Sequence, residues 1–232
     1  MTDVTIPAPD GNFGAYLAAP AGAGKAPGML VIQEIFGINP TIRGICDEYA
    51  ARGYLAVAPD LFWRQEAGVQ LDSGTKAGWD RAIPLMQGFS QAKGVEDLVV
   101  TLAWLRGHER CNGRAGAVGY CLGGKLAYLM ATRSNSDATV GYYGVGIADS
   151  VGEANAITHP FMLHVAEKDG FVPRDQQETV RKALEPITHV TIHTYPGVDH
   201  AFARKGGDHY DATAAHLADT RTAEFFERYL KG

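Results

Sequence analysis

The chain has 232 residues, of which 46% are hydrophobic and 20% charged, with a formal net charge of −5. These proportions are typical of a globular protein and exclude intrinsic disorder as a description of the whole chain. The sequence contains no cluster of Lys and Arg and no run of 18 apolar residues, so we expect neither a nucleic-acid partner nor a membrane span.

Cysteine use and the first residues bear on the compartment. The three cysteines, Cys46, Cys111 and Cys121, are widely spaced and odd in number, which fits neither a disulfide framework nor a zinc site. The first residues show no basic segment followed by an apolar one, so no signal peptide is expected. We therefore predict a protein of the reducing cytoplasm.

Apolar strands alternate with helices along the chain. Residues 28–33 form a strand that is apolar on both faces, and Asn39 and Pro40 are typical of a helix start, with Gly53 as its stop. The further strands are expected at 54–58, 115–118, 140–143, 161–165 and 190–194. The further helices are expected at 79–89, 95–107, 122–133, 174–184 and 213–230. This order predicts an α/β fold, a mostly parallel sheet covered by helices on both faces, in one domain over 1–232.

Ligands bind at the carboxyl ends of the strands in such sheets, and there the chain has a distinctive motif. Residues 119–124 read GYCLGG between a strand and a helix, which matches the nucleophile elbow G-x-S-x-G with Cys121 in place of Ser. The N–H of Leu122 would point to the place where an oxyanion forms. The alternative is that Cys121 is a small buried apolar residue, as most free cysteines are. Cys46 and Cys111 lie in no such setting.

A cysteine nucleophile needs a base, because a thiol with the ordinary pKa of about 8.5 is only about 3% ionised at pH 7. Asp169 follows one predicted strand and His200 the next, which is the chain order nucleophile, acid, histidine of α/β-hydrolases. His200 can take the thiol proton, and Asp169 can orient the ring. Asp199 is an alternative acid, less favoured because adjacent side chains point apart.

Charged residues near other strand ends are further candidates. Glu34 follows an apolar strand, where it either reaches water or faces Cys121 as a second titratable group. The N–H of Ile35 would be the second oxyanion donor. Arg81 and Arg204 are either solvated surface residues or, as guanidinium groups suit, ligands of a substrate carboxylate.

Six motifs in order resemble the dienelactone hydrolase family. They read EIFG at 34–37, APDL at 58–61, GYCLGG at 119–124, VGYYGVG at 140–146, DGFVP at 169–173 and HAFAR at 200–204. The resemblance covers essentially the whole chain. It implies an α/β-hydrolase fold without a large lid, usually monomeric and without a cofactor or metal. It also implies the opening of the lactone 4-carboxymethylenebut-2-en-4-olide to maleylacetate, in bacterial breakdown of chlorinated aromatics.

The resemblance also implies roles for individual residues. Cys121 would be the nucleophile, His200 the base and Asp169 the group that orients it, while Glu34 would keep the thiol neutral at rest and accept its proton once substrate binds. The remaining roles concern the substrate: Arg81 and Arg204 would grip its carboxylate, and Phe36 and Tyr143 would wall the pocket.

The chain departs from the family at one place. The family has a Tyr four residues after the Arg of the segment before the long helix, where this chain has Leu85. One alternative is therefore a related carboxylesterase that acts on another small ester or lactone. A second is a non-catalytic binding module or thiol redox sensor on a hydrolase scaffold.

Overall fold

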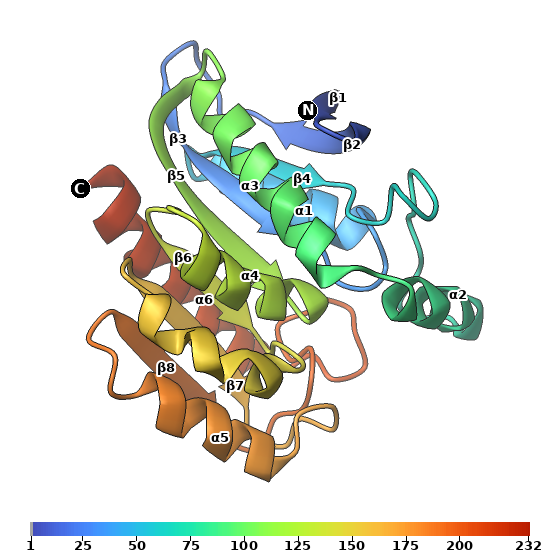
Figure 1. Cartoon of the computed structure of the whole chain (residues 1–232), viewed down its shortest axis with the longest axis vertical. Coiled ribbons are helices and arrows are strands. Elements are labelled where there is room, and N and C mark those ends of the chain that lie inside the picture. Colours follow the sequence, from blue (N-terminus) through green and yellow to red (C-terminus); the bar gives the residue numbers. More distant parts are fainter. Residues whose placement is uncertain (1) are drawn as a thin grey trace. The chain divides into compact units, whose positions relative to one another are not determined.

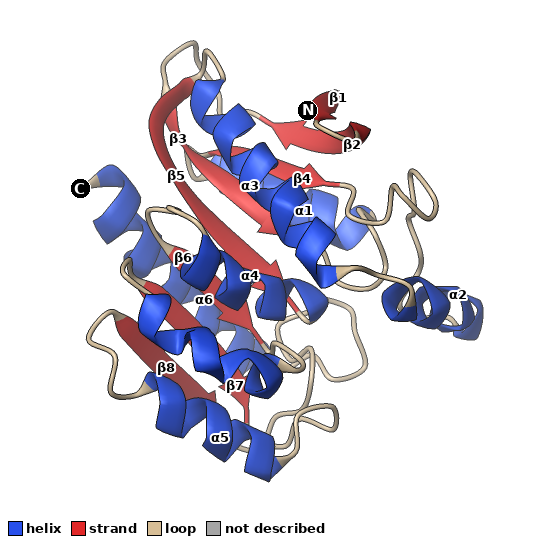
Figure 2. Ribbon diagram, viewed as in Figure 1, coloured by secondary structure: helices blue, strands red, loops and turns tan. Residues whose placement is uncertain are grey.

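The computed structural model describes residues 2–232, which form two compact units divided between Ala117 and Val118. Figure 1 labels the elements of each unit, and Figure 2 distinguishes helices from strands. One strand, β5 (Cys111–Tyr120), runs through the division.

The first unit begins with a β-hairpin that joins a parallel pair of strands. Its strands are hydrogen bonded in the order β1-β2-β4-β3-β5. The pairs β1·β2 and β2·β4 are antiparallel, whereas β3·β4 is parallel. The strands are β1 (Thr2–Ala8), β2 (Gly11–Ala18), β3 (Ala26–Ile32) and β4 (Leu55–Pro59). The helices are α1 (Pro40–Ala51), α2 (Lys76–Gln87) and α3 (Gln91–Gly107).

The second unit is a parallel sheet between helices. Its strands follow the order β5-β6-β7-β8, and β6·β7 and β7·β8 pair in parallel. Figure 1 shows α4 and α5 on one face of these strands and α6 on the other. The strands are β6 (Thr139–Tyr142), β7 (Phe161–Ala166) and β8 (Val190–Tyr195). The helices are α4 (Leu122–Arg133), the 3₁₀ segment η1 (Ile147–Ala156), α5 (Arg174–Leu184), α6 (Ala212–Phe226) and the π-helical turn η2 (Glu227–Lys231).

Most of the predicted elements are confirmed. The bounds of α4 and α5 agree with the prediction, and the start of α1 follows the predicted mechanism, since the Asn39 side chain accepts from the N–H of Ile42 at 3.2 Å. Every residue of β3 is buried, as its unbroken apolar run indicates.

Several bounds differ from the prediction. Ser90 caps α3, so this helix begins at Gln91 rather than at 95, and α2 begins at Lys76 because Thr75 caps it. Strand β5 is ten residues long, well beyond the predicted 115–118. The C-terminal helix leaves the α conformation after Phe226 and ends in the π turn η2. The hairpin of β1 and β2 and the segment η1 had no counterpart in the sequence prediction.

Strand register in the second unit brings two loops together. Because Ala166 pairs with Tyr195, the loops after β7 and β8 leave the sheet from adjacent positions. A buried polar chain supports these strands from the side of α6: His164 bonds the Tyr195 hydroxyl at 2.8 Å and the Thr222 hydroxyl at 2.8 Å. Thr222 in turn bonds the hydroxyl of Tyr142 at 2.7 Å. Side chains of β6, β7 and β8 are thus tied to one another and to α6 just below the loops.

Candidate active site

Cys121 lies on a strained turn between β5 and α4. Its backbone angles are φ 57° and ψ −114°, outside the helical and extended regions. A Cβ on Gly119 would come within 1.9 Å of the Gly123 carbonyl oxygen, and one on Gly124 within 2.3 Å of the Tyr142 oxygen. Only glycine therefore fits at both places, and the turn has the geometry of a nucleophile elbow.

The elbow is fixed to the neighbouring strand and opens a helix. The N–H of Cys121 donates to the carbonyl oxygen of Tyr142, the last residue of β6, at 3.1 Å. Leu122 is the first residue of α4, and N–H groups of a first helical turn have no acceptor within their own helix. The positive end of the helix dipole also lies here. Both properties suit an oxyanion beside Cys121.

His200 and Asp169 form a close, buried pair. His200 Nδ1 lies 3.1 Å from Asp169 Oδ1 and 3.0 Å from Oδ2, with side-chain exposures of 4% and 2% for the histidine and the aspartate. The N–H of Phe171 also donates to Asp169 Oδ1, at 2.9 Å. A carboxylate can only accept, so Nδ1 carries the hydrogen and Nε2 is left for the other partner.

That partner is Cys121, whose side chain is hydrogen bonded to the His200 ring. Burial lowers the pKa of His200, but hydrogen bonds with Asp169 and then with Cys121 outweigh it and raise this pKa to about 10. Because of the raised pKa, the ring holds a proton more firmly than a free imidazole does. The three side chains can therefore generate a nucleophile and hold its proton.

Two aromatic rings enclose the imidazole of His200. Tyr143 and Phe171 approach it edge to face, with ring centroids at 5.1 Å and 4.9 Å. Tyr143 is buried and has φ 37°, whereas Phe171 is 53% exposed. Phe171 was not predicted as a site residue, although it lies within the DGFVP motif, because a single exposed aromatic carries no signal of its own.

Asp199 occupies a different position from Asp169. Its Oδ1 accepts from the backbone N–H of Gly170 at 2.8 Å and of His200 at 2.6 Å. It is therefore bonded to the main chain on both sides of the pair, while the hydrogen bonds of the ring nitrogen go to Asp169.

The remaining predicted residues are distributed as follows. Arg204 is half-buried in the loop after β8. Glu34, Ile35 and Phe36 belong to the first unit and are buried, Phe36 with its ring edge to face with Trp79. Arg81 lies on α2 with a 56% exposed side chain, paired with Glu66 at 2.5 Å. The roles of these first-unit residues beside Cys121 stay predictions.

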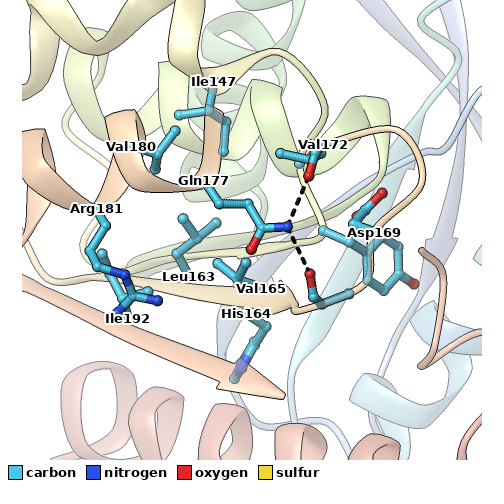
Figure 3. A pocket seen from close by; sticks show the side chains of 13 residues that line it. Ile147, Leu163, His164, Val165, Asp169, Val172, Gln177, Val180, Arg181 and Ile192 are labelled. Carbon is cyan, nitrogen blue, oxygen red and sulfur yellow. Dashed lines mark hydrogen bonds between the residues drawn. The ribbon is translucent and has the colours of Figure 1, made fainter. Parts of the chain in front are cut away.

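A small cavity lies between β7 and α5, next to Asp169 (Figure 3). Its volume of about 30 Å³ suits a water molecule rather than a lactone. Its walls are mostly apolar, and Gln177 reaches across it to donate to the carbonyl oxygen of Val172 at 2.8 Å. The cavity is too small for a lactone at this volume, and Gln177 in its wall supports the Asp169 loop.

Two properties of residues 2–232 bear on function classes. Nowhere in this range do three or more His, Cys, Asp or Glu side chains gather as metal ligands would. No helix in the same range has the length and apolar character needed to cross a membrane.

A parallel sheet flanked by helices, an elbow at the end of β5, and a His–Asp pair on the following loops define an α/β-hydrolase. Over residues 13–230 the sequence matches the model of the dienelactone hydrolase family. The chain belongs to this family, and it is a hydrolase that acts on ester or lactone bonds.

Individual relatives agree with this assignment. An Azospirillum brasilense protein provisionally named carboxymethylenebutenolidase is 52% identical over 99% of this chain and 100% of its own length. A carboxymethylenebutenolidase of Pseudomonas putida is 37% identical, over 96% of this chain and 94% of its own. The crystal structure of a provisionally named dienelactone hydrolase from Klebsiella pneumoniae superposes with a TM-score of 0.87 at 29% identity, covering 98% of both chains.

Proposed function

We propose that the protein hydrolyses dienelactone, 4-carboxymethylenebut-2-en-4-olide, to maleylacetate through Cys121, His200 and Asp169. The observation that carries the proposal is the single hydrogen-bonded series of these side chains, with Asp169 3.0 Å from His200 Nδ1 and Cys121 bonded to the same ring. The names of the curated relatives support the choice of substrate.

The reaction has two halves. In the first, His200 takes the thiol proton of Cys121, the sulfur adds to the lactone carbonyl carbon, and the N–H of Leu122 holds the oxyanion. Collapse breaks the ring C–O bond and forms a thioester, and the imidazolium of His200 protonates the leaving oxygen. In the second, His200 takes a proton from water, hydroxide adds to the thioester carbon, and the C–S bond breaks to return the thiolate and release the acid.

Other predicted residues take supporting roles in the proposal. Glu34 keeps the thiol neutral until substrate binds, and the N–H of Ile35 is the second oxyanion donor. Arg204 and Arg81 bind the substrate carboxylate, and Phe36 and Tyr143 wall the pocket. These roles rest on the family resemblance. The cytoplasmic location and the monomeric state likewise stay predictions, the second open to light scattering in solution.

The test is hydrolysis of cis- and trans-dienelactone by wild type and Cys121→Ala. We expect the wild type to turn over and the variant to lose kcat by at least about 10³-fold. After acid quenching, the wild type should carry an acyl adduct on the peptide that contains Cys121. Cys111→Ala is the matched control and should retain full activity, because the Cys111 thiol lies at the far end of β5. Undiminished turnover by Cys121→Ala would refute the proposal.

One observation favours a second candidate, a carboxylesterase for another small ester or lactone. Arg81 is exposed and already paired with Glu66, so binding a substrate carboxylate would require it to leave that partner. A panel of acidic and neutral esters separates the two candidates. Arg81→Ala raises KM selectively for acidic substrates if dienelactone is the substrate, and affects both kinds equally if it is not.

A further inference from the structure

Two carboxylates other than that of Asp169 connect the loops that carry Asp169 and His200. The acid loop is defined as residues 167–173 and the base loop as residues 196–202. From the base loop, Asp199 accepts a hydrogen bond from the N–H of Gly170 at 2.8 Å. From the acid loop, Glu167 accepts one from the N–H of Gly197 at 2.8 Å. Each loop thus places a carboxylate on the main chain of the other.

Main-chain bonds continue the connection in register. The N–H of Glu167 donates to the Tyr195 oxygen at 3.1 Å, and that of Lys168 to the Val198 oxygen at 2.9 Å. On its far side the acid loop is held to α5, because Gln177 donates to the Val172 oxygen. The acid loop is therefore fixed at both ends, and its middle is fixed by Asp199.

Asp199 bonds the main chain beside both the acid and the base. The same oxygen, Oδ1, accepts from Gly170, the residue after Asp169, and from the N–H of His200 itself at 2.6 Å. Bonds from an N–H to a carboxylate are shorter and about twice as strong as neutral ones. One atom is thereby bonded to both of the main chains that present the Asp169 carboxylate and the His200 ring.

We propose that Asp199 and Glu167 form a reciprocal clamp and are positioning residues for the hydrolysis: they hold Asp169 at bonding distance from His200. The inference rests on the proposed roles of Cys121, His200 and Asp169. Misplacement of a catalytic group by about 1 Å can cost about 10²-fold in rate, so two main-chain anchors on adjacent loops are enough to matter.

The charged groups around the clamp support an ionised Asp199. His200 and His209 face it, and His209 Nδ1 lies 3.8 Å from Asp199 Oδ2 and 3.1 Å from the carbonyl oxygen of His200. Burial raises the pKa of Asp199, but the N–H groups of Gly170 and His200 and these histidines together lower it. The carboxylate is thus ionised throughout the neutral range in which the enzyme is assayed.

The first experiment is a kinetic comparison of Asp199→Ala, Asp199→Asn and Glu167→Ala, with Asp208→Ala, an exposed aspartate outside the clamp, as control. Asn keeps an oxygen that accepts both N–H bonds, whereas Ala keeps none. We expect Asp199→Ala to lower kcat by about 10- to 100-fold with KM nearly unchanged, and Glu167→Ala to lower it by about 5- to 10-fold. Asp199→Asn should stay within about fivefold of wild type.

The second measurement does not depend on the substrate. The rate at which iodoacetamide alkylates Cys121 is followed against pH, since it reports how readily the thiol loses its proton beside His200. If the clamp holds Asp169 on the ring, Asp199→Ala weakens the imidazolium and moves the alkylation profile to higher pH by about 0.5 to 1 unit. A role in stability alone lowers the urea midpoint and leaves this profile in place.

The possible results separate the explanations. Rescue by Asn together with a displaced profile supports the clamp. The clamp is refuted if the pH profile of alkylation is unchanged in both alanine variants. It is also refuted if Asp199→Ala and Asp199→Asn lose kcat equally, because the charge of Asp199 would then matter rather than its main-chain bonds. If Asp199→Ala does not fold, Glu167→Ala carries the test. Full activity of Cys121→Ala would instead refute the proposed function, independently of the clamp variants.

Discussion

Asp169→Asn keeps the size of the side chain and removes the charge that His200 contacts. In the wild type both carboxylate oxygens lie within 3.1 Å of His200 Nδ1, and both side chains are almost fully buried. The amide offers one neutral oxygen, and its NH₂ group cannot accept from Nδ1–H. Phe171 already donates to Oδ1 at 2.9 Å, so the neutral oxygen is shared. The His200 ring then loses the partner that fixes its orientation and determines which of its nitrogens carries the hydrogen.

The size of the effect follows from these contacts. A hydrogen bond to a charged group contributes about 1.5–3 kcal/mol, and in the proposed mechanism the same carboxylate stabilises the imidazolium that forms when His200 takes the Cys121 proton. Together these contributions give about 3–5 kcal/mol, which corresponds to a loss of about 10²–10⁴-fold in kcat/KM. The equivalent change in a Ser-His-Asp protease costs about 10⁴-fold in kcat. The pKa of His200 should also fall from its raised value, because Asp169 is the strongest of the partners that raise it.

The assay is steady-state hydrolysis of dienelactone and of p-nitrophenyl acetate from pH 5 to 10. Asp199→Asn serves as the matched control, since it also exchanges a carboxylate for an amide one residue from His200 but keeps the main-chain bonds. We expect a large loss for Asp169→Asn on both substrates and a small one for Asp199→Asn. If Asp169→Asn keeps kcat/KM within tenfold and Asp199→Asn falls more than a hundredfold, the acid is Asp199 and the reasoning is wrong.

Three further predictions follow from the site. Gly119→Ala forces a Cβ to within 1.9 Å of a backbone oxygen and should cost about 3 kcal/mol or more in urea unfolding, whereas Gly152→Ala, with nothing within 4 Å, should be neutral. The folded-state pKa of His200 is raised from 6.5 to about 10. The contribution of His200 to the stability of the folded state is therefore fully present below pH 6.5 and is lost as the pH rises to 10. Over that range the urea midpoint of wild type should fall more steeply than that of His200→Gln. Arg204→Ala should raise KM about tenfold or more for dienelactone and little for a neutral ester; equal increases would exclude carboxylate binding.

Much of the second unit could be predicted from the sequence because its local signals agree with its tertiary structure. Unbroken apolar runs predict buried parallel strands, and α4 and α5 begin and end where the sequence pattern changes. The order of Cys121, Asp169 and His200 along the chain predicts that they follow strands of one sheet. Parallel pairing of β7 with β8 then brings their loops to the same edge.

The N-terminal hairpin was missed although its signal is present. Asp10-Gly11 is a typical turn signal, and in the structure Pro9 and Asp10 form the turn between the paired residues Ala8 and Gly11. Ile6 and Phe13, on either side of this turn, are both buried and paired in register. The adjacent Pro7, however, argues against a strand. It is accommodated because β1 is the edge strand of the sheet order, where a missing N–H breaks no ladder. Only the strand order, a tertiary property, distinguishes this position from a loop.

The clamp could not have been predicted either, because side-chain to main-chain bonds leave no residue pattern. Asp199 is adjacent to a histidine and Glu167 lies near an aspartate. The sequence therefore indicates Asp199 as an alternative acid, and it does not indicate that Asp199 and Glu167 hold the two loops together. The side chains of Asp199 and His200 point apart. In the structure Asp199 uses that divergence to reach the N–H of Gly170 while the His200 ring reaches Asp169.

Backbone strain follows the same geometry. Within residues 2–232 the non-glycine residues with positive φ are Cys121, Tyr143 and Ala201. Cys121 directly follows β5, Tyr143 directly follows β6, and Ala201 directly follows His200. Cys121 and Tyr143 also interact with the His200 ring. Conformations of this kind cost about 1–3 kcal/mol each and persist only where neighbouring contacts enforce them. In the second unit those contacts are the elbow glycines, the polar chain through His164 and the bonds between the two loops. The residues that bear the strain are thus held by side chains that need not touch the substrate.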